Sequence, residues 1–358
     1  MLRNLCVTLC VAALGVGATA CGDSDVAGQD RPTCDLFSNL VVDGGVGRDG
    51  IPALTNPNLA VADSADFLQP GDRVLGVVQN GTARAYPIPV LWWHEIINDT
   101  LGGEPVLTTY CPLTGSGLAF DPRVGAAGTV AEFGVSGLLF ENNLMMFDRE
   151  TESLWPQLLL GAACGDETGT ELRRVAVVET TWDAWRAEHP TTTVVSRNTG
   201  FNRDYDTYPY GNYDLPSNPV LLAPSSPYSM ARLPKELMLG VQVGGETVAY
   251  PYAVLDTLGT VSAVNDTVGG QPIVVTFHAA SNTPLAFDAR VAGVVLTLAV
   301  SGSVPELLED AQTGSLWTHW GLAVDGPLNG TRLRQLRDAY TVFWFAWSIF
   351  HPDTRLFR

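Results

Sequence analysis

Short stretches in which apolar and polar residues alternate, separated by turns that contain glycine, dominate the chain. Residues 73–79 (RVLGVVQ) and 82–87 (TARAYP) alternate in this way, and an Asn-Gly pair joins them. Such a pair between two alternating runs is the strongest short signal for a β-hairpin. Residues 105–110 (PVLTTY) predict a buried strand that ends at Cys111. The pattern is therefore typical of antiparallel sheets.

Helical patterns are few and short. We expect a helix over residues 89–97, which has Pro near its first turn, and another over 181–188, with Thr180 or Thr181 as its N-cap. Shorter strands are expected at residues 130–136, 144–147 and 192–196.

The whole pattern occurs twice. Three stretches of the first half return in the second, in the same order: 75–87 as 239–251, 98–106 as 265–273, and 118–124 as 285–291. Self-similarity at one long period indicates two copies of one structural unit. We therefore predict an α+β fold made of two tandem homologous repeats of mainly antiparallel strands with short helices, packed with pseudo-twofold symmetry.

The repeats define the organisation of the chain. Repeat one spans residues 73–196 and repeat two spans 236–358, with a loop rich in tyrosine and proline at 197–235 between them. An N-terminal loop segment covers residues 46–72. Neither repeat has a clean end, and an aromatic-rich connection usually packs across a junction. We therefore expect intimately packed repeats rather than independent domains.

The N-terminus has the features of an export signal. Residues 1–20 contain one basic residue and an apolar run that is too short to span a bilayer as a helix. The signal ends Ala-Thr-Ala before Cys21, which resembles the lipobox of bacterial lipoproteins and implies cleavage before Cys21 and lipidation there. The alternative is an ordinary signal peptide cut nearby. Residues 21–45 would form a tether, so we expect an exported protein attached to a membrane by lipid only.

Charge narrows the range of partners. The chain has 20 Lys+Arg against 38 Asp+Glu. Without the signal, which holds one base and no acid, 19 bases face 38 acids, a net charge of −19. Such a surface repels nucleic acid and anionic lipid, so we expect no nucleic-acid partner. Protein partners cannot be read from the sequence.

Three cysteines remain after the signal and the lipidated residue are set aside. They are Cys34, Cys111 and Cys164. Because three is an odd number in an oxidising compartment, at least one thiol stays free or finds another partner. If a disulfide forms, we expect it between Cys34 and Cys164, with Cys111 left as a thiol.

Differences between the repeats mark candidate functional residues, because residues common to both are expected to serve the fold. The strand-end position of Cys111 in repeat one is held by His278 in repeat two. Repeat two has no counterpart of His94 and Glu95, and it has His319 where repeat one has a glutamine. Cys and His both act as metal ligands and as acid, base or nucleophile.

The first functional hypothesis is a metal site. If the equivalent strand ends face each other across a pseudo-twofold axis, Cys111 and His278 meet, together with His94 or His319. A thiolate with imidazoles suits copper, which we favour, or zinc. The protein would then be a metal-binding or redox-accessory lipoprotein. A structural role for each histidine is the alternative.

Two further hypotheses differ in class. Cys111 could be the nucleophile of a cysteine-dependent enzyme, with His94 or Glu95 as base. The chain could instead be a non-catalytic surface or assembly module in which Cys111 is merely buried. The neighbours of Cys111 separate the three: histidines indicate a metal, His94 or Glu95 alone indicates catalysis, and apolar residues alone indicate a module.

Many motifs in one order resemble the domain of unknown function 3179 family, over residues 46 to 358. They are DGIPALTNP (49–57), WHEIINDT (93–100), TYCPLTGSGLAFD (109–121), FGVSGLL (133–139), FDRETESLW (147–155), TGFNRDYDTYPYGNY (199–213), LPKELMLGV (233–241) and FWFAWSIFHPDT (343–354). The resemblance implies an exported or membrane-associated bacterial or archaeal protein without an assigned reaction. Many members have a second cysteine where this chain has Thr114, which argues against dithiol chemistry here.

Overall fold

The two alternating runs of repeat one form the expected hairpin. In the computed structural model, which describes residues 40–303 and 306–358, strands β4 (Arg73–Gln79) and β5 (Thr82–Pro87) pair antiparallel. Asn80 and Gly81 between them have φ of 48° and 75°, as the tight turns of hairpins require. The signal at 1–20, Cys21, Cys34 and most of the tether lie outside the described residues.

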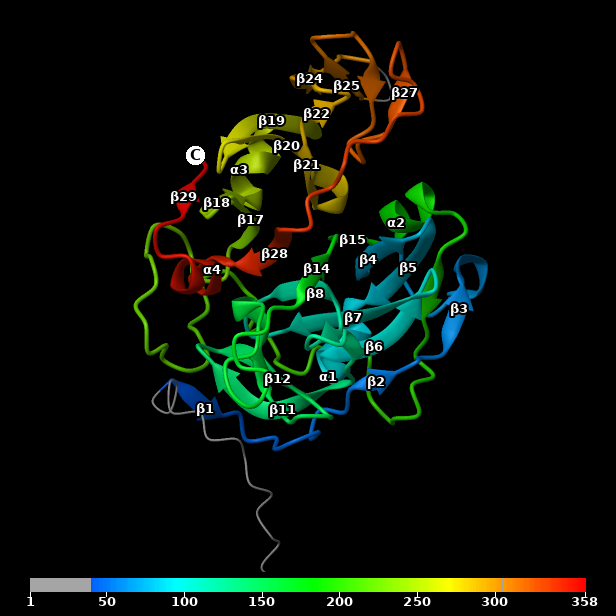
Figure 1. Ribbon diagram of the computed structural model, residues 1–358. Helices are drawn as coiled ribbons and strands as arrows, with labels where there is room; N and C mark the ends of the chain where they lie inside the picture. Colours follow the sequence, from blue (N-terminus) through cyan, green and yellow to red (C-terminus); the bar gives the residue numbers. More distant parts are fainter. Residues whose placement is uncertain (1–39, 304–305) are drawn as a thin grey trace, which may run out of the picture. The chain divides into compact units, whose positions relative to one another are not determined.

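We use "first segment" for residues 73–196 and "second segment" for 236–358; both belong to one compact unit. The hairpin of the second segment consists of β17 (Leu237–Val243) and β18 (Glu246–Pro251), also antiparallel. Its turn is formed by two glycines, as the sequence predicts. The described chain is built mostly of strands in mainly antiparallel sheets with few short helices, which confirms the class of fold (Figure 1).

Each hairpin is the centre of a larger sheet. In the first segment the order is β15-β4-β5-β16-β3, where the added strands are β15 (Val177–Thr181), β16 (Thr193–Val195) and β3 (Leu59–Val61). In the second segment the order is β28-β17-β18-β29, where the added strands are β28 (Ala339–Phe343) and β29 (Arg355–Leu356). The last strand of each segment, β16 or β29, pairs parallel to its hairpin.

A second sheet in each segment carries the candidate residues. In the first segment its order is β14-β8-β7-β6-β2: β14 (Arg173–Val175), β8 (Ser116–Asp121), β7 (Glu104–Cys111), β6 (Ile96–Leu101) and β2 (Leu54–Thr55). In the second segment it is β19 (Val261–Val268), β20 (Gln271–His278) and β21 (Thr283–Asp288), in that order. Apolar residues of the hairpin sheet and of this sheet form one cluster in each segment.

The remaining strands form smaller sheets. One four-stranded sheet has the order β1 (Val41–Asp43), β11 (Phe133–Phe140), β12 (Asn143–Asp148) and β13 (Leu154–Pro156). Its counterpart has the order β24 (Leu298–Val300), β25 (Leu308–Asp310), β26 (Leu316–Trp317) and β27 (Ala323–Asp325). Two pairs complete the set: β9 (Arg123–Val124) with β10 (Thr129–Val130), and β22 (Arg290–Val291) with β23 (Val294–Val295).

The helices of the described residues are α1 (Ile88–His94), α2 (Trp182–Glu188), α3 (Tyr252–Leu255) and α4 (Trp344–Phe350), with 3-10 turns at Ala62–Ser64, Gln157–Leu159, Asp256–Leu258 and Ala279–Ser281. α2 begins where the sequence predicts, because the Thr181 hydroxyl accepts the N–H of Ala184. α1 is shorter than the predicted 89–97. It ends at His94 because Glu95 takes a left-handed φ of 56° and β6 starts directly after it.

The two segments pack against each other through equivalent strands. β15 lies against β21, where the hydroxyl oxygens of Thr180 and Thr283 are 2.6 Å apart. β28 lies against β8, and the N–H of Phe343 donates to the carbonyl of Thr114 at 2.8 Å. The order of the main elements is similar in both segments, although β14 and β27 have no strand counterpart in the other segment, and descent from one repeat and the pseudo-twofold relation stay predictions.

The loop 197–235 contacts both segments. The Tyr213 hydroxyl donates to the carbonyl of Leu113 at 2.8 Å, and the Trp344 indole N–H donates to the carbonyl of Ser229 at 2.7 Å. Among the described residues we find no helix with the length and apolar character needed to cross a membrane.

Candidate active site at the end of strand β7

Cys111 is the last residue of β7 and a free, buried thiol, 1% exposed. The N–H of Leu144 points at its Sγ atom at 3.4 Å, and the thiol approaches the carbonyl of Asn142 at 3.7 Å. The backbone N–H and the hydroxyl of Thr114 act on the pKa of the thiol in the same direction as the N–H of Leu144. These donors lower the pKa of the thiol, since hydrogen bonds to the charged form favour it.

Glu95 lies beside this thiol because α1 ends one residue earlier and turns sharply. Its φ of 56° is unusual for a residue with a Cβ and costs on the order of 1–3 kcal/mol. Burial raises the pKa of the Glu95 carboxyl to about 8, while the nearby Tyr210 side chain acts in the opposite direction. A strained, buried carboxyl of this kind is typical of functional sites.

Glu95, Cys111 and Tyr210 line one cavity of about 100 Å³. The other lining side chains are apolar and come from the N-terminal loop, β11, β12 and the 197–235 loop: Val46, Ile51, Leu113, Val135, Leu138, Leu139, Leu144 and Leu221. Burial, and after it the negative charge of Glu95, raises the pKa of the Cys111 thiol to about 11. The cavity thus places a neutral thiol next to a group that exchanges protons near neutral pH.

A buried polar network fixes the turn that follows Cys111. The centre is Gln157, whose amide nitrogen donates to Thr109 Oγ1 at 2.8 Å. Its amide oxygen accepts from the Ser116 hydroxyl at 2.7 Å and from the Asn143 amide at 2.9 Å. Asn143 also donates to the Thr114 hydroxyl at 3.1 Å. Because every member is buried and bonded, the network holds the sulfur and its donors rigidly.

His94 does not take part in this site. Its two ring nitrogens are each 2.7 Å from a partner, the carbonyl of Pro52 and the hydroxyl of Tyr205. Burial is the main cause that lowers the pKa of His94 to about 4. The ring is therefore neutral and held by the N-terminal and inter-segment loops, in a structural role.

His278 and His319 meet each other instead of Cys111. Their rings stack with centroids 4.6 Å apart and an interplanar angle of 20°. The Nδ1 atom of His278 is 2.7 Å from the Ser281 hydroxyl, whereas Nε2 of His319 is buried with no hydrogen-bond partner. Burial lowers the pKa of both, that of His319 to about 3, so both are neutral at pH 7.

The residues proposed as one metal site thus fall into three places. Cys111 lies with Glu95, His94 with Tyr205, and His278 with His319. No group of three or more His, Cys, Asp or Glu within residues 40–303 and 306–358 is placed to hold a metal. Where the segments meet, β15 contacts β21, β28 contacts β8, and β15 and β28 contact each other, so strands other than β7 and β20 make the principal contacts there.

Tyr210 is a member of the site that the sequence analysis did not single out. The tyrosine-rich loop was noted only as a connection, and no spacing within it marks this residue. The same holds for the partners of Gln157, because a buried amide network leaves no periodic trace in a sequence. Cys164 is buried and disulfide-bonded, but Cys34 lies outside the described residues, so their pairing stays a prediction.

These features define a mostly β protein whose candidate active site is a buried free thiol paired with a carboxyl at the end of a central strand. The chain matches, over residues 48–354, the family model described as protein of unknown function DUF3179, and it belongs to that family. Searches of curated proteins and of solved structures find no significant match.

Proposed function

We propose that this chain is a cysteine-dependent enzyme, with Cys111 as nucleophile and Glu95 as the group that accepts the thiol proton. The observation that carries the proposal is their common cavity, which holds one sulfur, one carboxyl and one phenol among apolar side chains. Of the partners considered for Cys111 from the sequence, only Glu95 lies beside it. That outcome favours catalysis over a metal site or an inert module.

The carboxylate form of Glu95, which can accept a proton, predominates above its pKa of about 8. Because the pKa of the thiol is about 11, the transfer is uphill until the sulfur reacts. When Glu95 accepts the proton of Cys111, the negative charge that raises the pKa of the thiol disappears. The thiolate that forms keeps its hydrogen bond from the N–H of Leu144. The proton moves from Sγ to a carboxylate oxygen, and the sulfur lone pair then forms a bond to an electrophilic carbon while the electron pair of one of that carbon's bonds to an electronegative atom moves to that atom. Tyr210 lines the same cavity as the two groups.

The cavity limits the substrate. A volume of about 100 Å³ with mainly apolar walls fits a small uncharged electrophile of a few heavy atoms. A bulky or charged substrate does not fit, because desolvating a charge among leucine and valine side chains is costly. Entry requires movement of the covering loops, since the thiol is 1% exposed.

Labelling of the folded protein tests the proposal. At pH 8, iodoacetamide, which is small and uncharged, is expected to modify Cys111, as read by peptide mass spectrometry. A bulky fluorescein maleimide is expected not to react. Cys111→Ser is the control for specificity, because Cys164 is disulfide-bonded. Modification only after denaturation would contradict an active thiol and favour the inert module.

A second candidate, copper binding by His278 and His319, rests on a different observation. These two are the predicted ligands that lie against each other, and Nε2 of His319 is buried without a partner. Copper(I) accepts few ligands and suits imidazole. Titration with Cu(I) is expected to show one site that His319→Ala weakens and Cys111→Ser does not. Equal binding by the wild type and His319→Ala excludes it.

We also propose that the chain arose by duplication of one unit and is exported and anchored by lipid on Cys21. The similar order of the main elements in the two segments supports the first point, and the lipobox-like sequence supports the second. Cys21→Ala is expected to move the protein from the membrane fraction to the soluble fraction. Retention of the variant in the membrane would exclude the lipid anchor.

A further inference from the structure

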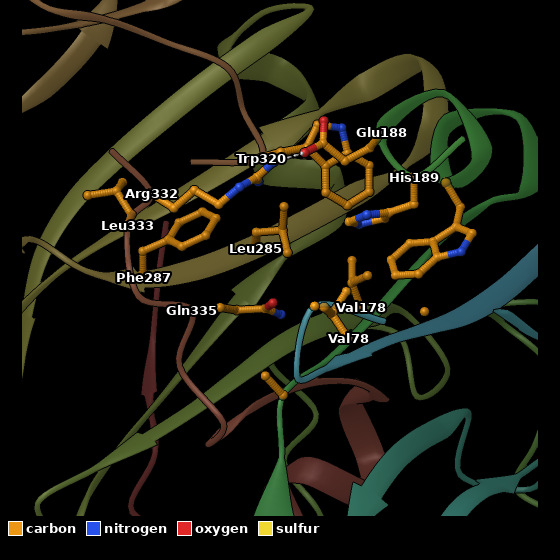
Figure 2. Close-up of a pocket in the computed structure, with 14 residues that line it drawn as sticks. Val78, Val178, Glu188, His189, Leu285, Phe287, Trp320, Arg332, Leu333 and Gln335 are labelled. Atoms are coloured by element: carbon orange, nitrogen blue, oxygen red, sulfur yellow. Dashed lines mark hydrogen bonds and ion pairs between the residues drawn. The ribbon is translucent and has the colours of Figure 1, made fainter. Parts of the chain in front are cut away.

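A second, larger cavity of about 380 Å³ lies where the two segments meet, and Glu95 and Cys111 do not line it. Figure 2 shows Val178 and His189 of the first segment opposite Leu285, Phe287 and Trp320 of the second. Its size falls in the range of about 300–1,000 Å³ that is typical of small-molecule sites. Aromatic and aliphatic side chains make up most of the wall.

The floor of this cavity is a tryptophan that packs on a glycine. Gly76 of β4 has no side chain, and a methyl group there would overlap the ring of Trp185. The second segment has the same arrangement, with Gly240 under Trp347. Each tryptophan also contacts the histidine four residues later in the chain. The ring centroids are 4.2 Å apart for Trp185–His189 and 4.1 Å apart for Trp347–His351.

The two segments differ in the residue that pairs with this glycine on the neighbouring strand. Gly76 pairs with Val178 of β15, and Gly240 pairs with Tyr340 of β28. The ring of Tyr340 packs edge-on against Trp347, with centroids 5.6 Å apart and an interplanar angle of 66°. A valine at the corresponding place leaves the space of that ring open. The first segment therefore contains a cavity where the second contains a phenol ring.

We propose that this cavity binds a small uncharged aromatic molecule, whose ring takes the position against Trp185 that the Tyr340 ring takes against Trp347. Aromatic pairs in edge-to-face contact gain about 0.5–1.5 kcal/mol beyond the burial of their area. An open site above a tryptophan thus selects aromatic over aliphatic occupants.

A second aromatic wall strengthens the selection. The ring centroid of Trp320 is 6.3 Å from that of Trp185, with an interplanar angle of 66°. It is 6.2 Å from the ring centroid of His189, with an interplanar angle of 73°. Trp320 stands three residues after Trp317, and the residue three after Trp155 in the first segment is the aliphatic Leu158. The cavity at Gly76 is therefore bounded by two indoles, those of Trp185 and Trp320.

The polar groups at the cavity indicate an uncharged ligand. Glu188 and Arg332 form an ion pair at 3.0 Å across the junction, so neither charge is left for the ligand (Figure 2). The side chain of His189 makes no hydrogen bond to the described part of the chain. Burial, and after it the charge of Arg332, lowers the pKa of His189 to about 4, so the ring is neutral. A neutral imidazole both donates and accepts, which suits a polar substituent on the ring.

The probe is p-cresol, the side-chain analogue of tyrosine, titrated into the full chain and followed by calorimetry. We expect one site with a Kd on the order of 1 mM, as a fragment of this size allows. Val178→Tyr, which supplies the ring covalently, is expected to weaken binding at least about 10-fold. Val130→Tyr, at an exposed valine, is the matched control and leaves binding unchanged.

The reciprocal variant sharpens the test. Tyr340→Val opens the corresponding space in the second segment, so the stoichiometry is expected to rise from one to two. 4-Methylcyclohexanol, which has a similar shape but no π-system, is expected to bind wild type about 3-fold more weakly than p-cresol.

Absence of p-cresol binding to wild type, or equal binding by Val178→Tyr, overturns the proposal. If Val178→Tyr does not fold by circular dichroism, Trp320→Leu replaces it, with binding expected about 5-fold weaker through loss of one aromatic wall. Unchanged binding in that variant also overturns the proposal.

Discussion

The ends of strands β7 and β20 share a pattern of strand pairing and carry different side chains. Both strands pair antiparallel with the next strand through a short turn, with Cys111 opposite Ser116 and His278 opposite Thr283. Next to the first lies the carboxyl of Glu95. In the first segment, the carbonyl of Glu95 accepts the N–H of Tyr110. At the equivalent place in the second segment, Ser262 pairs with Phe277. A few side chains therefore convert one scaffold into an acid–thiol site and an imidazole stack.

The supports of the two sites are conserved within the molecule. The indole N–H of Trp155 donates to Asp148 and that of Trp317 to Asp310, both at 2.9 Å. Behind this common support, a buried amide network holds the thiol, whereas hydroxyl groups surround His278. The two sites thus share the indole–carboxylate support and differ in the polar groups around the strand end.

The largest expected effect concerns the pH dependence that Glu95 gives the first site. In the unfolded chain a glutamate titrates near 4.5, and in the folded protein the pKa of Glu95 is about 8. The raised pKa means that this carboxyl favours the folded state at low pH, and that this contribution is lost as pH rises from about 4.5 to about 8. The stability of Glu95→Gln relative to wild type should therefore rise by up to about 5 kcal/mol over this range.

Urea unfolding at several pH values measures this difference. Ser262→Ala is the matched control, because Ser262 stands at the corresponding place and does not titrate. A constant difference between Glu95→Gln and wild type from pH 4 to 9 would show that Glu95 is not held in its neutral form.

Gln157 follows Trp155, and His319 stands at the equivalent position after Trp317. Substitutions at these two residues should show the second-largest difference in stability. Gln157→Ala removes four hydrogen bonds and leaves buried partners unsatisfied, at an expected cost of about 4 kcal/mol in unfolding free energy. His319→Ala removes a ring whose Nε2 has no partner, and its cost is expected to be about 1–2 kcal/mol. Equal costs in unfolding free energy, measured by denaturant titration, would contradict the view that Gln157 stabilises its site more strongly than His319 stabilises the second site.

The glycines under the two tryptophans give a smaller contrast. A methyl group at Gly240 pushes Trp347 against Tyr340, so Gly240→Ala should destabilise the protein by about 3 kcal/mol. At Gly76 the displaced Trp185 can move into the adjacent cavity, and Gly76→Ala should cost about 1 kcal/mol. Thermal unfolding of both variants measures this difference, and the reverse order would contradict an open cavity beside Trp185.

Much of the fold follows from local patterns. The hairpin turns, the strand that ends at Cys111 and the cap of α2 were predicted because each depends on a few neighbouring residues. The end of α1 was predicted three residues too late. Its termination depends on the left-handed conformation of Glu95, which tertiary packing imposes and which helix propensity does not reveal.

The site was predicted only in part, for a physical reason. Comparison of the two halves selected Cys111 and Glu95, but it also suggested that equivalent strand ends converge. Convergence depends on how two sheets dock, and that docking depends on long-range packing that no local pattern encodes. Tyr210 reaches the site from a loop whose path no periodicity encodes.

The central claim is that Glu95 takes the proton of Cys111, and the pH profile of Cys111 alkylation by iodoacetamide tests it most directly. Removing the negative charge of Glu95 lowers the pKa of the thiol, whereas removing a base slows its reaction. We therefore predict that Glu95→Gln reacts about 100-fold more slowly than wild type at pH 8 and faster than wild type above pH 10, while Glu150→Gln, at an exposed carboxyl, follows wild type. Faster reaction of Glu95→Gln at every pH would mean that Glu95 is only a neighbouring charge, and would contradict the account.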